Sequence, residues 1–245
     1  MKKKEYRDRI YKNYNTACPT RLAPTNLEGL KHRTPYLRNL IHRYFPQDRK
    51  ASILDLGCGY GAILYFARQT GYTNLRGIEV SSEQCETASK LGIEGVEEGD
   101  LRDVLTGLDD ASQDCIVTFD VLEHFTQEEL IPLVDDIFRV IKPGGRWIIH
   151  TINGESPFFG RIRYGDFTHE IVFTRISISQ LLLSTGFRNV QSIEDEPIIH
   201  GVISIFRWFF WIIIRNLMRL YIAIETGYPG KDTIFSQNFL VIANK

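Results

Sequence analysis

The sequence predicts an α/β protein in which helices cover both faces of a mostly parallel sheet. Short β-type apolar runs alternate with helix-type runs from residue 51 to residue 195, and this alternation is typical of strands joined by helical crossovers. A length of 245 residues fits one such domain with an appendage. With 43% hydrophobic and 24% charged residues, the composition excludes a disordered chain and collagen.

The individual elements follow from this alternation in chain order. We expect strands over residues 52–56, 75–80, 95–98, 114–119, 146–151, 188–193 and 233–243, the last as an edge strand. We expect helices over residues 61–70, 82–91, 127–141 and 176–185. Three of these helices are followed by glycine or proline, the usual signals that end a helix. The signals are Gly92, Gly186 and the run Lys142-Pro143-Gly144-Gly145.

The segments outside the alternation are predicted as two additions to this domain. Residues 1–50 are rich in Tyr, Arg and Pro and are predicted to form a helical cap or lid. Residues 197–231 hold a dense apolar and aromatic run and are predicted to form a helical insertion. The α/β domain itself would then comprise residues 51–196 and 232–245.

The apolar run of the insertion is predicted to form an amphipathic helix over residues 202–224. A membrane span needs roughly 18 apolar residues with few charges, and only the segment Trp208–Ile214 separates Arg207 from Arg215. At about 100° per residue, Arg207, Arg215 and Arg219 share one side. The opposite side carries Val202, Phe206, Phe209, Phe210, Ile213, Leu217, Leu220 and Ile224.

This pattern favours a helix that lies in the plane of a membrane surface. Trp208 and Trp211 fall among the arginines, as expected where aromatic rings and cations meet lipid headgroups. A homodimer interface and a helix packed on its own domain are the alternatives.

Charge and cysteine content limit the partners and the compartment. Lys and Arg number 29 against 30 Asp and Glu, so the chain has no basic field and no nucleic-acid partner is expected. The four cysteines, Cys18, Cys58, Cys85 and Cys115, lack any CxxC spacing and predict free thiols in a reducing cytoplasm. Charged residues follow Lys2–Lys4 where a signal peptide would be apolar, so we expect a cytoplasmic protein, peripheral on the inner face of the cell membrane if the helix meets lipid.

A glycine-rich turn follows the first strand and predicts a ligand site. The strand ends in Asp55 and runs into the segment 57–61, with glycine at its first, third and fifth positions. In an open α/β sheet this turn lies where ligands bind. The spacing does not match the G-x-G-x-x-G dinucleotide fingerprint, and Asp55 would repel a pyrophosphate but attract an ammonium group. The pattern therefore favours a positively charged ligand, with helix capping by Asp55 as the alternative.

Acidic residues end the next three strands as well. Glu79 lies 24 residues after Asp55, close to the spacing at which an acidic residue binds ribose hydroxyls. Asp100 is placed to accept from an adenine amino group, and Asp120 ends the fourth strand. A solvated strand end for Glu79 and a helix cap for Asp100 remain the structural alternatives.

Together these residues resemble the class I S-adenosylmethionine-dependent methyltransferases. The shared motifs, over about residues 45–195, are DLGCGYG at 55–61, GIEVS at 77–81, EGD at 98–100, FDVLEH at 119–124 and KPGG at 142–145. The resemblance implies a seven-stranded Rossmann-like sheet in the order 3-2-1-4-5-7-6 and S-adenosylmethionine as cofactor. It implies that the cofactor contacts Asp55, Gly57, Cys58, Gly59, Tyr60, Gly61, Glu79, Val80, Asp100, Leu101, Asp120 and Val121.

The acceptor side requires a base if the acceptor is a hydroxyl, and histidine is the commonest one. His124 follows the fourth strand, and His169 lies near Asp166 and Glu170 in the insertion after the fifth strand. The catalytic candidates are therefore His124, His169 and Asp166. The alternative for His124 is a packing role. The alternatives for the cluster around His169 are a stabilised loop and a divalent-cation site, but we assign no metal ligand. His150, inside an apolar strand, is predicted to be a core histidine.

The substrate class follows from a shorter resemblance. Residues 165–187 resemble methyltransferases found with bacterial polysaccharide and glycolipid assembly genes. This implies O-methylation of a sugar or a lipid-linked glycan. Methylation of a quinone-like phenol is the alternative among enzymes, and a non-catalytic membrane adaptor that retains the fold is the alternative outside them.

Overall fold

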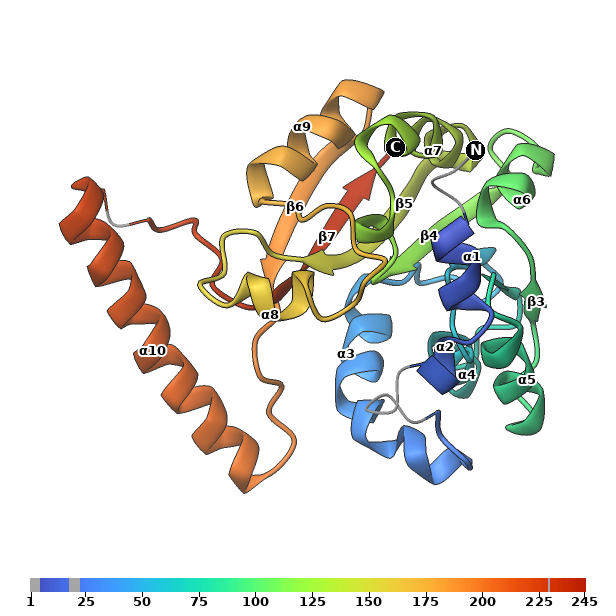
Figure 1. Cartoon of the computed structure of the whole chain (residues 1–245), viewed down its shortest axis with the longest axis horizontal. Coiled ribbons are helices and arrows are strands. Elements are labelled where there is room, and N and C mark those ends of the chain that lie inside the picture. Colours follow the sequence, from blue (N-terminus) through green and yellow to red (C-terminus); the bar gives the residue numbers. More distant parts are fainter. Residues whose placement is uncertain (1–4, 18–22, 229) are drawn as a thin grey trace.

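The computed structural model describes residues 5–17, 23–228 and 230–245 and contains one seven-stranded sheet. Figure 1 shows the sheet at the centre of the molecule, in the order β3-β2-β1-β4-β5-β7-β6. The predicted strand order is confirmed. The strands are β1 (Ile53–Leu56), β2 (Leu75–Glu79), β3 (Val96–Glu98), β4 (Gln113–Phe119), β5 (Ile141–Ile152), β6 (Arg188–Glu194) and β7 (Asn238–Asn244).

The C-terminal strand is not at the edge, so that expectation was wrong. β7 lies between β5 and β6 and runs antiparallel to both, with Trp147 paired to Ala243 and Ile193 to Leu240. Residues 239–243 are buried without interruption, whereas no residue of β6 is fully buried. A strand that is apolar on both faces is stable only with a neighbouring strand on each side and helices over both faces. The half-exposed β6 does not need this protection and can form the edge of the sheet.

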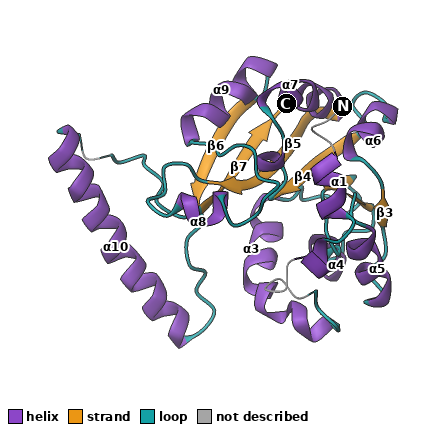
Figure 2. Ribbon diagram, viewed as in Figure 1, coloured by secondary structure: helices purple, strands orange, loops and turns teal. Residues whose placement is uncertain are grey.

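Helices cover both faces of the sheet (Figure 2). Together with the sheet they form two apolar cores. One core packs α6 (Leu101–Gly107), α7 (Gln127–Val140) and α9 (Arg175–Thr185) on Leu54, Leu56 and Ile116. The other packs α3 (Thr34–Tyr44) and α4 (Ala62–Gln69) on Ile53, Val117 and Ile148. Alternate strand residues thus serve opposite faces. The helices of the sheet domain are α4 (Ala62–Gln69), α5 (Ser82–Lys90), α6 (Leu101–Gly107), η2 (Leu122–His124), α7 (Gln127–Val140), α8 (Phe159–Arg163) and α9 (Arg175–Thr185).

Several boundaries differ from the sequence prediction for local reasons. α6 was not predicted; Asp100 caps it by accepting from the Arg102 amide at 2.9 Å. β5 begins at Ile141, five residues early, because the Lys142–Gly145 run stays in the sheet opposite an irregularity in β4. β7 begins at Asn238 because the carbonyls of Ile234 and Ser236 bond instead to the Asn153 side chain.

Within the described residues that precede the sheet, four helices reach toward its carboxyl edge. They are α1 (Glu5–Tyr11), α2 (Tyr14–Ala17), η1 (Leu27–Arg33) and α3 (Thr34–Tyr44). Arg7 of α1 pairs with Glu129 at 2.9 Å, and the Asn15 amide of α2 donates to Glu83 at 2.6 Å. These contacts hold α1 and α2 against the helices that follow β2 and β4.

The predicted amphipathic helix is one continuous helix, α10 (Val202–Thr226), set apart from the other elements in Figure 1. Its arginine side faces the protein: Arg215 pairs with Glu194 at 2.9 Å and Arg219 donates to the Lys231 carbonyl at 3.2 Å. Its apolar side is exposed. None of the helices in the described ranges combines the length and apolarity that crossing a bilayer requires.

Three of the four cysteines, Cys58, Cys85 and Cys115, are free thiols. Cys18 lies outside the described residues.

Candidate active site

A cavity of about 1100 Å³ opens at the carboxyl edge of the sheet. The ends of β1, β2 and β4 form one wall, and residues of α1, α2 and η1 form the other. All of the predicted cofactor residues line it except Gly61. Its volume is at the upper limit of small-molecule sites, which run to about 1,000 Å³, so the cavity has room for a cofactor and an acceptor together.

The glycine turn has the geometry of a close backbone approach. Gly57 and Gly59 have φ of 72° and 56°, and a Cβ at Gly57 would lie 2.5 Å from Cγ2 of Val121. A side chain there would also close the cavity wall. Gly61 serves packing instead, because a Cβ there would lie 2.7 Å from Cγ2 of Val96.

Asp55 is the most unusual group in the cavity. Its side chain is buried, and neither carboxylate oxygen has a hydrogen-bond partner among the described residues. Burial and the nearby charge of Glu79 raise the pKa of Asp55 to about 8. Leaving such a group unpaired is costly, so this site fits a ligand that brings an ammonium group. It does not cap the helix, the alternative considered from sequence.

Glu79 is held by the turn it faces. Its two carboxylate oxygens accept from the amides of Gly59 at 2.9 Å and Ser81 at 2.8 Å. Burial raises the pKa of Glu79, while these amide bonds oppose the shift. Each oxygen keeps a second lone pair, so a pair of ribose hydroxyls can still donate to it.

Asp100 and Asp120 line the cavity but are also bound within the protein. Asp100 caps α6 and pairs with Arg102 at 3.0 Å, so the helix-cap alternative also holds. Asp120 has a φ of 58° and lies 2.6 Å from Nδ1 of His150. Although burial acts to lower it, Asp120 and Asp195 raise the pKa of His150 to about 10.

His150 is therefore a buried cation with a carboxylate at each ring nitrogen. Nε2 lies 3.4 Å from Asp195, and the ring stacks on Phe119 with centroids 4.0 Å apart. The burial of His150 agrees with the predicted core histidine. Its ion pair with Asp120 holds the strained backbone of that residue at the cavity wall.

At the acceptor end, His124 lines the cavity and is fixed in one tautomer. The Thr168 hydroxyl lies 2.6 Å from a carboxylate oxygen of Asp166 and 2.9 Å from Nδ1 of His124. A hydroxyl has one proton, which goes to the carboxylate, so Nδ1–H of His124 donates to Thr168. Burial and the charge of His169 lower the pKa of His124 to about 4. The imidazole is thus neutral, and Nε2 is its unprotonated nitrogen.

His169 lies beside His124 but not on the cavity wall. The centroids of the two rings are 4.7 Å apart, and Nδ1 of His169 donates to the Ile162 carbonyl at 3.0 Å. The structure thus brings the three catalytic candidates together, with Asp166 directed through Thr168 to His124. No group of three or more metal-ligating side chains occurs in the part of the chain that the structure describes.

Glu123 holds the acceptor loop in place. The buried carboxylate accepts from Thr151 at 2.9 Å, and the Glu123 carbonyl accepts from the Glu170 amide at 2.7 Å. Burial and Asp120 raise the pKa of Glu123 to about 8. Glu123 therefore has a packing and positioning role.

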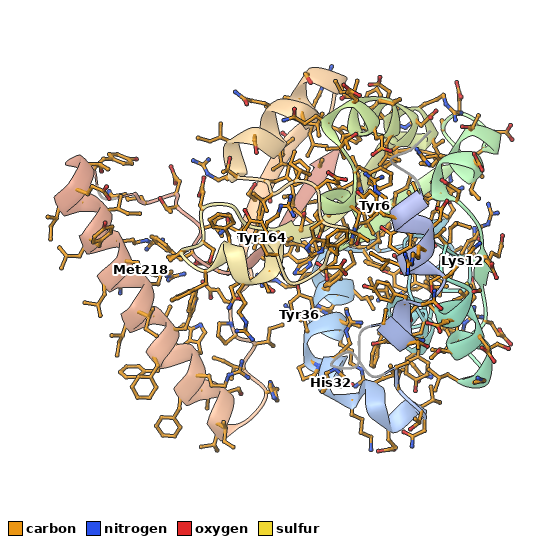
Figure 3. All side chains as sticks on the ribbon, viewed as in Figure 1. Tyr6, Lys12, His32, Tyr36, Tyr164 and Met218 are labelled. Atoms are coloured by element: carbon orange, nitrogen blue, oxygen red, sulfur yellow. The ribbon has the colours of Figure 1, made fainter. Side chains whose placement is uncertain are left out.

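The site residues missed from sequence include Arg33, Tyr11 and Thr168. Arg33 of η1 donates to the Tyr60 hydroxyl at 3.2 Å and lies over the Phe119 ring, near enough to Asp55 to oppose its pKa rise. The Tyr11 ring meets His124 edge-on at 6.0 Å. Figure 3 shows His32 and Tyr36 on the neighbouring η1 and α3. No motif marks these residues, because segments far apart in the chain bring them to the site.

Comparison with known proteins places this geometry in a family. The family described as "Methyltransferase domain" matches residues 30–192. Cyclopropane mycolic acid synthase 3 of Mycobacterium tuberculosis is 27% identical over 59% of this chain and 51% of its own length. A ubiquinone biosynthesis O-methyltransferase of Rickettsia felis is 32% identical over 49% of each. A crystal structure of a SAM-dependent methyltransferase from Archaeoglobus fulgidus superposes with a TM-score of 0.68 at 21% identity, over 88% of this chain and 94% of that one.

The chain belongs to the methyltransferase-domain family, since the match spans more than half of its length. It also spans about half the length of the two curated relatives above.

Proposed function

We propose that this protein transfers a methyl group from S-adenosylmethionine to a hydroxyl of a sugar or a lipid-linked glycan. The observation that carries the proposal is the pairing, in one cavity, of two groups. One is the buried carboxylate of Asp55, which has no hydrogen-bond partner among the described residues, and the other is the neutral imidazole of His124. The first suits a cationic methyl donor, and the second suits an acceptor that must lose a proton.

The donor half of the cavity has a group for each part of S-adenosylmethionine. Asp55 would hold the ammonium, Arg33 the carboxylate and Glu79 the ribose hydroxyls, with the turn 57–61 against the methionine chain. The adenine would lie at Asp100 and Leu101. When bound, the cofactor would supply an electrophilic methyl group attached to a sulfonium sulfur. The sulfur would leave as a neutral thioether.

The protein's own residues align the acceptor and take its proton. A bond forms from the acceptor oxygen to the methyl carbon as the carbon–sulfur bond breaks, and the hydroxyl proton goes to Nε2 of His124. Asp166, acting through Thr168, keeps Nδ1–H in place and stabilises the imidazolium that forms. Orientation in the cavity supplies several kcal/mol of the barrier reduction.

The acceptor class rests on three supports. Residues 165–187 resemble methyltransferases of polysaccharide and glycolipid assembly, the synthase relative is named for a lipid, and α10 exposes an apolar side. A quinone-like phenol is the second candidate, favoured by the 32% identity to a ubiquinone biosynthesis O-methyltransferase. A non-catalytic adaptor has less support, because the donor cavity keeps its full set of groups. We place the protein in the cytoplasm, at the inner face of the cell membrane, with α10 as its contact surface.

The test is incubation with methyl-labelled cofactor and a panel of lipid-linked glycans, sugar nucleotides and phenols, with product masses measured. We expect a methyl ether on a glycan hydroxyl. Label in a phenol alone would select the second candidate. Cofactor binding by calorimetry without transfer to any member would refute the proposed acceptor class.

A further inference from the structure

The outward side of α10 is an apolar surface that no other part of the described chain covers. Thirteen of the 23 exposed large hydrophobic residues belong to this one helix. Phe206, Phe210 and Leu217 are 58–60% exposed, and Val202 and Ile224 at its ends are 70% and 77% exposed. In Figure 3, where Met218 marks the helix, side chains project from its outer side with no other element beyond them.

The helix is held in this orientation by its arginine side. Arg215 bonds to both Glu194 and Glu196, which flank Asp195, the partner of His150. Three consecutive acidic residues therefore join α10 to the group that fixes Asp120 at the cavity. An ordinary surface helix buries its apolar face against the core. In α10, Arg215 and Arg219 face the protein instead, and the apolar face points outward.

A second exposed aromatic set lies on the loop that carries the acceptor side. Phe158, Tyr164 and Phe167 are 65%, 78% and 81% exposed. Phe167 lies between Asp166 and Thr168 in sequence, and the Tyr6 ring of α1 packs edge-on against it at 5.9 Å. Exposed cations adjoin both sets: Arg161 in α8 and Arg207 at the margin of α10.

The width of the apolar surface favours a bilayer over a second copy of this chain. On a helical count the exposed aliphatic and phenyl side chains span about 180°, from Ile205 to Ile214. A partner helix covers only the narrower seam of two positions in seven.

We propose that α10 docks on the surface of a lipid bilayer, its apolar side among the acyl chains and Arg207 at anionic headgroups, so that the acceptor reaches the cavity from the membrane. The proposal identifies the surface at which the methyl transfer would take place. Only its statement about the acceptor rests on the proposed function. A bilayer matches this surface chemically, because its acyl chains are apolar and its headgroup layer can be anionic.

Co-sedimentation of the full chain with vesicles tests the proposal. One vesicle is phosphatidylcholine alone and the other holds equal parts of phosphatidylcholine and phosphatidylglycerol. We expect binding to the mixed vesicles and a loss of at least about tenfold in lipid affinity in the variant Phe206→Ser/Phe210→Ser/Ile213→Ser. Arg207→Gln should lose about fivefold on the mixed vesicles and little on the neutral ones.

The matched control is Ile131→Ser/Ile176→Ser/Leu183→Ser, which removes three residues of 55–59% exposure from α7 and α9. It should bind vesicles as the wild type does. Light scattering after gel filtration gives the oligomeric state. Equal lipid binding by wild type and the α10 variant would overturn the proposal, as would a wild-type dimer that the α10 variant converts to a monomer.

S-adenosylhomocysteine affinity is measured for every variant by calorimetry. Lipid binding that fails while this affinity persists would overturn the docking surface alone. An absent affinity in the wild type would instead overturn the proposed methyl transfer.

Discussion

The donor half and the acceptor half of the cavity are built in different ways. The donor half consists of strand ends and one glycine turn within residues 55–101, where local chain geometry fixes each group, together with Arg33 of η1. The acceptor half joins α1 to the 122–124 turn and the 164–171 loop, which lie far apart in sequence. The donor half is thus set by secondary structure, and the acceptor half by side-chain contacts between segments.

The two halves also differ in how their charges are satisfied. Asp55 on the donor side has no hydrogen-bond partner among the described residues, so its ligand must supply one. His124 on the acceptor side is fixed through Thr168 and Asp166 before any ligand arrives. Substitutions on the donor side should therefore change binding, and substitutions on the acceptor side should change turnover.

The largest effect should come from His124→Ala. Removal of a general base lowers turnover by about 10²- to 10⁴-fold, while calorimetric affinity for S-adenosylhomocysteine should stay within about twofold. His169→Ala, which removes a buried ring off the cavity wall, is the comparison and should lose far less turnover. Full activity of His124→Ala would contradict its role as the base.

Asp55→Asn should weaken S-adenosylhomocysteine binding by about 30-fold or more, because it removes the charge partner of a buried ammonium. Methylthioadenosine lacks the amino-acid end and serves as the control ligand. Its affinity should change little. Equal losses for both ligands, measured by calorimetry, would place the ammonium elsewhere.

The same carboxyl group predicts a pH dependence of binding. Because the pKa of Asp55 is raised to about 8, the empty cavity holds it protonated at lower pH. Binding of an ammonium ligand then releases a proton, so affinity should rise by up to about tenfold per pH unit toward pH 8 and level off above it. Asp55→Asn should abolish this slope, and an unchanged slope in that variant would assign it to another group.

Thr168→Val should reduce turnover by about tenfold, since one positioning hydrogen bond contributes about 1.4 kcal/mol. Thr168→Ser keeps the hydroxyl and should recover most of the activity. The valine variant should also shift the acidic limb of the pH–rate profile, because the tautomer of His124 is no longer fixed. A serine variant as impaired as the valine variant would indicate a packing role only.

The smallest effect concerns stability and His150. Because the pKa of His150 is raised in the folded state, its ion pairs stabilise the fold fully at pH values below the unfolded-state pKa near 6.5. This stabilisation is lost as the pH rises through the folded-state pKa of about 10. The contribution is about 1 kcal/mol, because Asp120 is 47% exposed. The wild type should exceed Asp120→Asn in unfolding free energy near pH 6 and lose that advantage near pH 10. An advantage that grows with pH would contradict the assignment.

The contrast between the halves explains what sequence alone can predict. Asp55, Glu79 and the turn 57–61 were predictable because each follows a strand whose apolar run is evident, and parallel strands bring such ends to one edge. The strand order came from family resemblance. Arg33 and Thr168 were not predictable, since neither has a motif and only the packing of η1 and of the 164–171 loop brings them to the site.

α10 shows the same limit in another form. Its two sides were evident from the 3.6-residue period, but the period does not say which side meets the protein. Arg215 between Glu194 and Glu196 decides this, and those partners lie about twenty residues earlier in the chain.

The central claim is that Asp55 and Glu79 hold a cationic nucleoside while His124 faces the acceptor. A crystal structure of the complex with S-adenosylhomocysteine tests it most directly. We expect the ligand's ammonium within hydrogen-bond distance of Asp55, its ribose on Glu79, and Nε2 of His124 across the cavity from the sulfur with no intervening side chain. A nucleoside bound at another edge of the sheet, or in the reverse orientation, would contradict it.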